Sequence, residues 1–196
     1  QMLEGFSVFA NGGYRVQPYI IDRVTDSEGN LLMQAQPRLA GVNAPRAIDE
    51  RNAYIMHSLL HGVATDGTGR RAGNTLQRED IGAKTGTTND AVDAWFAGYA
   101  GNYVAVGWVG YDKPKPLGSS ETGGGLVLPI WLEYMQSALK DIPVYERQQP
   151  ADVVEIDGEL FYADQAAESV RTLGLGETSK PGEVDPVSGT IRDQIF

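Results

Sequence analysis

Residues 81–90 read Ile-Gly-Ala-Lys-Thr-Gly-Thr-Thr-Asn-Asp (IGAKTGTTND), a lone lysine followed by three threonines within four residues. Threonine favours β structure, and the two-residue period of a strand places Lys84 on one face and Thr85 and Thr87 on the other. Gly86 has no Cβ, so a second chain could approach the backbone closely there. The pattern predicts an edge strand along which a substrate docks as one more strand, with the lysine and hydroxyls holding an anion. For a bare Lys-Thr-Gly tripeptide, which is short and common, a plain solvent-facing strand is the better explanation, so the motif depends on its context.

The strand, expected over 81–88, is followed by a predicted hairpin of strands 94–99 and 103–111 around a Gly101-Asn102 turn. Both faces of the second hairpin strand are largely apolar, so we expect a sheet that is covered on both sides. Helical periodicity and capping residues predict flanking helices at 2–10, from Asp49 to 65 and from Pro129 to 139. This element order indicates an α+β fold, an antiparallel β-sheet flanked by helices.

Two further hairpins are predicted outside this sheet. Strands at 19–24 and 31–34 flank a polar turn, and Asp157-Gly158 separates two short apolar runs within 153–162. The glycine-rich segments that contain Arg70-Arg71 and residues 123–125 are expected to be a loop and a flexible connection.

The composition of the chain changes after Pro143. From Gly174 onward the residues are mainly glycine, serine, threonine, proline and charged types, which indicates a mobile tail. We therefore expect two parts, residues 1–142 as the main domain and residues 143–196 as a C-terminal extension with a short hairpin and a tail.

The overall composition excludes several classes of function. The chain has 196 residues, 26 acidic and 16 basic, for a formal net charge of −10, which argues against nucleic acid as a partner. It contains no cysteine, so disulfides, thiolate metal sites and cysteine nucleophiles are excluded. No apolar run approaches the roughly 20 residues of a membrane span.

Five motifs in the sequence resemble, in the same order, the C-terminal part of the transpeptidase domain of class A penicillin-binding proteins. The similarity covers about residues 2 to 140, and Lys84-Thr-Gly86 corresponds to the third signature motif of penicillin-binding proteins and serine β-lactamases. The motifs are FANGGYRVQPYII, GTGRRA, DIGAKTGTTNDAVDAWFAGY, VAVGWVGYD and LPIW.

This resemblance implies a penicillin-binding/serine β-lactamase-like transpeptidase fold whose N-terminal part, including two strands, lies outside this chain. It implies that Lys84 binds the substrate carboxylate and supports proton transfer, and that the Thr87 backbone N–H is an oxyanion donor. The residues expected to bind substrate are Thr85, Gly86, Thr87 and Thr88. Thr88 would also shape the end of the strand, and Trp95 would belong to the core. No cofactor and no metal is implied.

The implied function is that of a peptidoglycan D,D-transpeptidase, in which a serine acyl-enzyme transfers acyl groups from D-Ala-D-Ala stem peptides and β-lactams act as covalent inhibitors. Serine-type carboxypeptidase activity, a preceding glycosyltransferase domain, an inner-membrane anchor and a periplasmic catalytic domain belong to the same expectation. A β-lactam-sensing or peptidoglycan-binding module on the same fold, and an interaction role for residues 144–196, remain alternatives.

The nucleophile motif is missing from this chain. Ser-x-Asn does not occur, and the one Ser-x-x-Lys, Ser137 to Lys140, follows Lys84 and ends a helix, where the dipole disfavours an oxyanion. We therefore expect the nucleophilic serine and its lysine on an upstream segment. His57 and His61 have the spacing of a zinc-protease helix, but without its glutamate they are expected to be half-exposed helical side chains. A phosphate-binding loop fails because Ala83 precedes Lys84 where that motif requires glycine.

Overall fold

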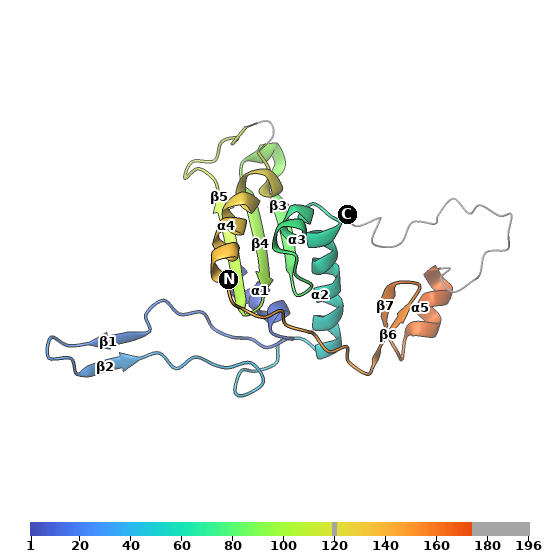
Figure 1. Ribbon diagram of the computed structural model, residues 1–196, viewed down its shortest axis with the longest axis horizontal. Coiled ribbons are helices and arrows are strands. Elements are labelled where there is room, and N and C mark those ends of the chain that lie inside the picture. The colour runs from blue at the N-terminus through green and yellow to red at the C-terminus, as the bar shows by residue number, and fades with distance from the viewer. Residues whose placement is uncertain (119–120, 174–196) are drawn as a thin grey trace.

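The computed structural model describes residues 1–118 and 121–173. Its centre is a three-stranded antiparallel sheet in the order β3-β4-β5, formed by Gly82–Thr87, Ala94–Ala100 and Tyr103–Val109 (Figure 1). The predicted hairpin turn is confirmed, and Gly101 adopts a positive φ of 57° there. Strand β3 stands at one edge of the sheet, as its sequence predicts.

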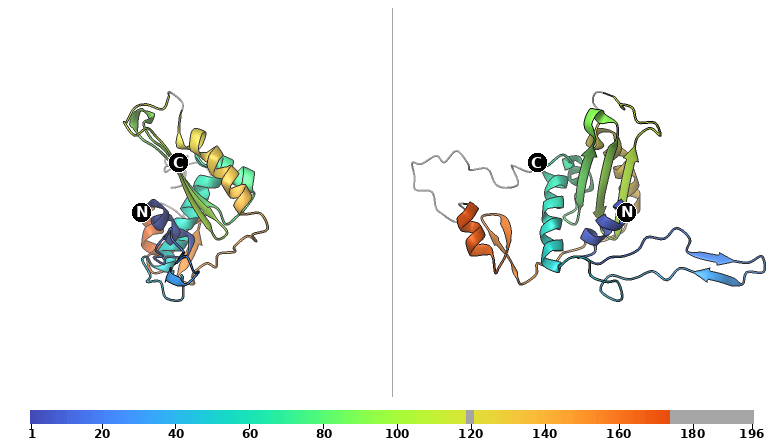
Figure 2. Two further views of the ribbon diagram at one scale, coloured as in Figure 1. Left: turned by 90° about the vertical axis from the view of Figure 1, so that its left-hand side faces the viewer. Right: turned by 180° about the vertical axis from the view of Figure 1, so that it is seen from behind.

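The buried core lies between one face of the sheet and three helices, α2 (Glu50–Thr65), α3 (Arg70–Leu76) and α4 (Leu128–Ala138) (Figure 2). The centroids of the Phe96 and Trp131 rings are 5.0 Å apart, and the Trp131 indole donates a hydrogen bond to the Ala105 carbonyl. The cluster also contains alanines from α2, α3 and β3, which let the helices pack close to the strands. The core residues are Ala64, Ala72, Ile81, Ala83, Ala94, Phe96, Ala100, Val127, Leu128, Trp131, Leu132, Met135 and Leu139.

The opposite face of the sheet is covered only in part. Tyr99 is 1% exposed there and contacts His57 of α2, so the expectation of a sheet covered on both sides is met for this part of the face and not for the rest of it. Helix α1 (Met2–Ala10) lies against β4 and β5, but its own residues remain at least partly exposed. Trp95 and Trp108 pack together on this face with centroids 6.0 Å apart, and Trp108 is 45% exposed. Trp95 therefore stacks on a half-open surface, and the expectation that it belongs to the core is wrong.

A long hairpin arm extends away from this body (Figure 1). Its strands are β1 (Arg23–Thr25) and β2 (Leu31–Gln34), and every residue of both is exposed. The prediction of a strand over 19–24 is thus mostly wrong, because only the residues that pair with β2 become regular.

Two segments expected to be irregular form short helices. Arg70-Arg71 begin helix α3, and residues 123–127 form the π-helical turn η2 (Gly123–Val127), which leads directly into α4. A 3-10 turn, η1 (Asn89–Ala91), joins β3 to β4.

The extension after α4 carries the predicted hairpin of β6 (Val153–Ile156) and β7 (Glu159–Tyr162), then α5 (Ala166–Leu173). Asp157 and Gly158 form its turn with φ values of 53° and 83°. Near β7, the Arg51 guanidinium of α2 lies 4.8 Å from the centre of the Tyr162 ring, so the extension is attached to α2. The predicted tail lies outside the described residues. Within those residues, every helix is too short or too polar to cross a bilayer.

Candidate active-site groove

The backbone groups of β3 alternate between its partner β4 and its free edge. The Thr88 N–H donates to the Asp93 carbonyl at 3.1 Å, on the β4 side. Since backbone N–H and C=O groups of successive residues in an antiparallel strand point in opposite directions, the N–H and C=O of Thr85 and Thr87 point away from β4. The Thr87 N–H, which is the predicted oxyanion donor, therefore points out from the free edge of the sheet.

Helix α2 covers the first part of this edge. A ring nitrogen of His61 lies 2.9 Å from the Ile81 carbonyl oxygen and must donate to it, because a carbonyl only accepts. Beyond this contact the edge opens into a groove of about 600 Å³ between β3, the end of α2 and η2. The groove is lined by Asp66, Gly67, Thr68, Arg70, Arg71, Thr85, Thr87, Thr122, Gly124 and Leu128.

Lys84 is exposed, and its side chain reaches the same edge. Its Nζ donates to the Thr85 carbonyl at 3.1 Å. The ammonium group thus lies at the outward-facing backbone of the strand, and among the residues that the structure describes it forms no ion pair with a carboxylate. Such a cation can attract the carboxylate of a ligand that docks along β3.

The hydroxyls of Thr85 and Thr87 lie on the core face of β3, as strand alternation predicts. The Thr85 Oγ1 is 2.7 Å from the Thr68 Oγ1, and the Thr87 Oγ1 accepts a hydrogen bond from the Gly123 N–H at 3.1 Å. A Cβ built on Gly123 would lie 2.7 Å from the Gly86 carbonyl, so the π-helical turn approaches the strand as only glycine allows.

Thr88 lies apart from the residues that line the groove. Its Oγ1 accepts a hydrogen bond from the Asp93 N–H at 2.8 Å across the η1 turn. The structure thus places Thr88 in the turn that ends β3, in keeping with its expected role in shaping the strand end. Its other expected role, in substrate binding, stays a prediction without a contact to support it.

The groove is basic although the chain is acidic. Arg70 and Arg71 line it together with a single acidic residue, Asp66, while the formal charge of the whole chain is −10. In the described part of the chain, neither arginine forms an ion pair with a carboxylate. The local charge therefore favours an anionic ligand.

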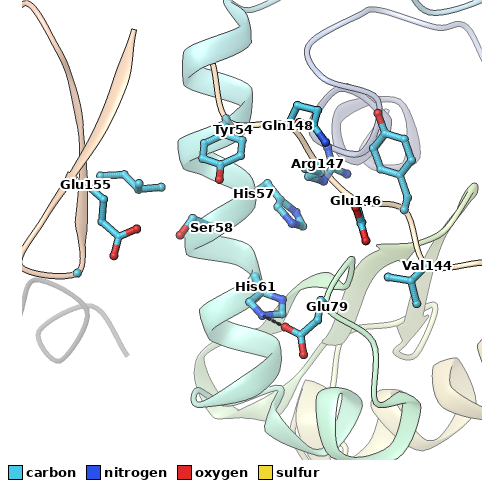
Figure 3. Close-up of a pocket in the computed structure, with 13 residues that line it drawn as sticks. Tyr54, His57, Ser58, His61, Glu79, Val144, Glu146, Arg147, Gln148 and Glu155 are labelled. Carbon is cyan, nitrogen blue, oxygen red and sulfur yellow. Dashed lines mark ion pairs between the residues drawn. The ribbon is translucent and has the colours of Figure 1, made fainter. Parts of the chain in front are cut away.

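The two histidines of α2 serve the packing of the fold. Burial, followed by the charges of Arg147 and His61, lowers the pKa of His57 to about 3, and its Nδ1 lies 2.9 Å from the Tyr99 hydroxyl. His57 is only 8% exposed, so the expectation of a half-exposed side chain is wrong for it. Figure 3 shows both histidines beside a second cleft, where the His61 Nε2 lies 3.6 Å from a Glu79 carboxylate oxygen.

The remaining sequence candidates lie elsewhere. Ser137 is exposed in the last turn of α4, away from the residues that line the groove. In the described ranges, histidine, aspartate and glutamate side chains do not form groups of three that could hold a metal ion. Sequence reasoning gave no role to Thr68 or Gly123. Thr68 lies in the GTGRRA motif, and the signal at Gly123 was the glycine-rich composition around it.

A helix-backed antiparallel sheet with a lysine-threonine edge strand beside an open groove is the architecture of penicillin-binding transpeptidases, and comparison with known proteins agrees. A family model described as the penicillin binding protein transpeptidase domain matches residues 1–136. The chain therefore belongs to the penicillin-binding protein transpeptidase family, which confirms the predicted resemblance and fold class.

Individual relatives support this assignment. The chain is 47% identical over 169 residues to penicillin-binding protein 1A of Neisseria flavescens, covering 86% of this chain and 21% of that protein. It is 39% identical over 196 residues to penicillin-binding protein 1A of Pseudomonas aeruginosa, covering 77% of this chain and 24% of that protein. The chain thus spans only about a fifth to a quarter of these relatives.

Solved structures show the same fold. The crystal structure of penicillin-binding protein 1A from Haemophilus influenzae matches with a TM-score of 0.76 and 31% identity, over 83% of this chain and 31% of that one. An imipenem acyl-enzyme complex of penicillin-binding protein A from M. tuberculosis matches with a TM-score of 0.51 and 22% identity, over 70% of this chain and 30% of that one.

Proposed function

We propose that this chain supplies one wall of a D,D-transpeptidase active site that cross-links peptidoglycan. The observation that carries the proposal is the open part of the β3 edge, where the outward-facing backbone of Thr85 and Thr87 adjoins the Lys84 ammonium and the basic groove. Family membership supports the reaction class, because the matched family is named for transpeptidation.

A D-Ala-D-Ala stem peptide would dock along this edge as an additional strand. The Thr85 hydroxyl and the Lys84 ammonium would bind its terminal carboxylate, with Gly86 allowing close approach. The Thr87 N–H would donate to the carbonyl oxygen under attack and stabilise the oxyanion that forms in the transition state. Each of these groups lies on or beside the same stretch of strand, so one docked peptide reaches all of them.

The nucleophilic serine and its lysine would come from polypeptide outside this chain that carries Ser-x-x-Lys and Ser-x-Asn. The serine Oγ attacks the penultimate D-Ala carbonyl, the bond to the terminal D-Ala breaks, and the leaving amine takes up the serine proton. An amine on a neighbouring peptidoglycan strand then accepts the acyl group. In a carboxypeptidase reaction, water accepts it instead. A β-lactam would acylate the same serine, by analogy with the acyl-enzyme that imipenem forms with penicillin-binding protein A of M. tuberculosis.

The resemblance to class A penicillin-binding proteins also implies a setting for the whole protein. We propose a periplasmic domain held at the inner membrane by a segment outside this chain, in a protein that also carries a glycosyltransferase domain. Within this chain, we propose that residues 1–142 complete the transpeptidase domain and that residues 143–196 are an extension of it.

Acylation by a fluorescent penicillin tests the proposal in the full-length protein. Replacing Lys84 by Ala should slow acylation by on the order of a hundredfold or more, as for other preorganised electrostatic groups. The matched control is Lys140→Ala, an exposed lysine at the end of α4, and Ser137→Ala should likewise label at the wild-type rate. Normal acylation of the Lys84 variant would show that the site is misplaced.

A cross-linking assay with stem-peptide substrate separates the enzyme from the sensing alternative. The transpeptidase should form cross-linked dimers and release D-Ala at a rate that depends on Lys84. A full-length protein that labels with penicillin yet forms neither product would be a β-lactam-sensing or peptidoglycan-binding module.

A further inference from the structure

The hydroxyl of Thr68 lies 2.7 Å from the hydroxyl of Thr85, across the groove from β3. Thr68 belongs to the loop that links α2 to α3, so the two side chains meet from separate elements. Both residues line the groove, together with Arg70 and Arg71. The contact therefore joins a loop of unassigned role to a hydroxyl that the proposed function places on the substrate carboxylate.

The backbone around Thr68 is fixed independently of its side chain. The Gly67 N–H donates to the Gly62 carbonyl at 3.0 Å, and the Gly69 N–H donates to the Val63 carbonyl at 2.9 Å. A Cβ on Gly69 would lie 3.0 Å from that Val63 carbonyl, so the loop is closely packed on the end of α2. The Thr68 hydroxyl is thus presented at a set position before any ligand arrives.

The hydrogens available to the pair decide what it can do. Each hydroxyl has one hydrogen to donate, and either oxygen can act as the acceptor in this contact. If Thr85 donates to Thr68, its hydrogen is unavailable to a carboxylate. If Thr68 donates to Thr85, the Thr85 hydrogen is free to point into the groove.

We propose that Thr68 is a positioning residue: it donates its hydrogen to the Thr85 Oγ1 and so directs the Thr85 hydrogen toward the substrate carboxylate. This inference rests on the proposed transpeptidase function. The basic lining from Arg70 and Arg71 favours the same arrangement, because an anion in the groove orients the hydroxyl hydrogen toward itself.

Acylation rates of the full-length protein by benzylpenicillin test this role. Thr68→Val keeps the shape of the side chain but removes its hydrogen, and should lower the second-order acylation constant about five- to tenfold, the worth of roughly one hydrogen bond. Thr68→Ser keeps a hydroxyl and should stay within about twofold of wild type. The matched control is Thr75→Val, an exposed threonine on α3 that lies outside the groove lining.

Two further measurements separate positioning from a loss of packing. With the methyl ester of benzylpenicillin, which lacks the carboxylate charge, the Thr68→Val and wild-type proteins should react at nearly equal rates. In a Thr85→Val background, the Thr68 substitution should have no further effect, because its route to the ligand is gone.

Each outcome bears on one of the two claims. If wild-type protein is acylated normally and Thr68→Val reacts equally fast, or loses the same factor toward the ester, the positioning role is overturned while the proposed function stands. If the wild-type full-length protein is not acylated at all, the proposed function fails and this inference fails with it.

Discussion

The buried carboxylate of Asp80 gives a sharp test of how β3 is held in place. Asp80 lies just before the strand and is 3% exposed. It accepts two hydrogen bonds from Arg78, at 2.9 and 2.8 Å, and one each from the N–H groups of Gly101 and Tyr145. Burial opposes its ionisation, but these hydrogen bonds outweigh burial and lower the pKa of Asp80 below its usual value. One carboxylate thus connects β3, the β4-β5 turn and the extension.

Replacing Asp80 by Ala would leave the Arg78 guanidinium, whose side chain is only 10% exposed, without its partner. Removing one member of a buried ion pair costs about 3–5 kcal/mol. A chain of this size loses roughly 2–4 °C of melting temperature per kcal/mol, so we expect a fall of about 6–20 °C. Thermal unfolding at pH 7, followed by tryptophan fluorescence, measures this difference.

A surface pair with the same separation provides the control. The Glu4 carboxylate lies 2.8 Å from Arg15, as the Asp80 carboxylate does from Arg78, but these side chains are 25% and 67% exposed. Exposed pairs contribute about 0–1 kcal/mol, so Glu4→Ala should lower the melting temperature by less than about 4 °C. Equal melting temperatures for the two variants would refute the argument that burial makes the Asp80 contacts important.

Three other substitutions test separate parts of the fold. The folded-state pKa of His57 is about 3, below its unfolded value, so the free energy of unfolding should fall as the pH drops below about 6.5. His57→Gln should reduce this pH dependence of the free energy of unfolding, measured by urea titration at several pH values. A Cβ on Gly82 would lie 2.5 Å from the Tyr99 ring, so Gly82→Ala should destabilise the fold by about 1–3 kcal/mol. A Cβ on Gly5 would have no atom within 4 Å, so Gly5→Ala should not destabilise it, and chemical denaturation compares the two variants. Arg51→Ala removes the ring contact that attaches the extension and should raise hydrogen exchange in β6 and β7 without changing that of β3.

Elements with local signals could be predicted from the sequence. The Asp49 side chain accepts from the Arg51 N–H and caps α2 as expected, and both tight hairpin turns carry positive φ at their glycines. Each signal involves residues a few positions apart, and strand alternation then fixes which side chains share a face.

Helix α3 and the π-helical turn escape prediction because their stability comes from contacts distant in sequence. A Cβ on Gly73 would lie 2.6 Å from the Ala64 carbonyl, so α3 needs this glycine to pack against α2. The sequence predicts a loop there because Gly67 and Gly69, just before the helix, lower helix propensity. Gly123 is required in the same way where η2 meets β3.

The candidate site divides along the same line. The strand pattern alone places Lys84 opposite Thr85 and Thr87, and the structure agrees. The contacts that organise those hydroxyls come from 17 and 36 residues away, at Thr68 and Gly123. No periodicity within the strand could reveal these partners, so only the structure shows that Thr68 and Gly123 contact the two hydroxyls.

The open edge of β3 also explains why Lys84 lies where it does. Unpaired strand edges invite association with other chains, and folded proteins protect them with helices or charged side chains. Here His61 of α2 donates a hydrogen bond to the Ile81 carbonyl, and farther along the edge the Lys84 ammonium donates one to the Thr85 carbonyl. A strand-like ligand that donates to the Thr85 carbonyl would replace the ammonium there and release it for the ligand's own carboxylate. A peptide docked along β3 would thus exchange the Lys84 contact, whereas the His61 contact belongs to helix α2 itself and would stay in place.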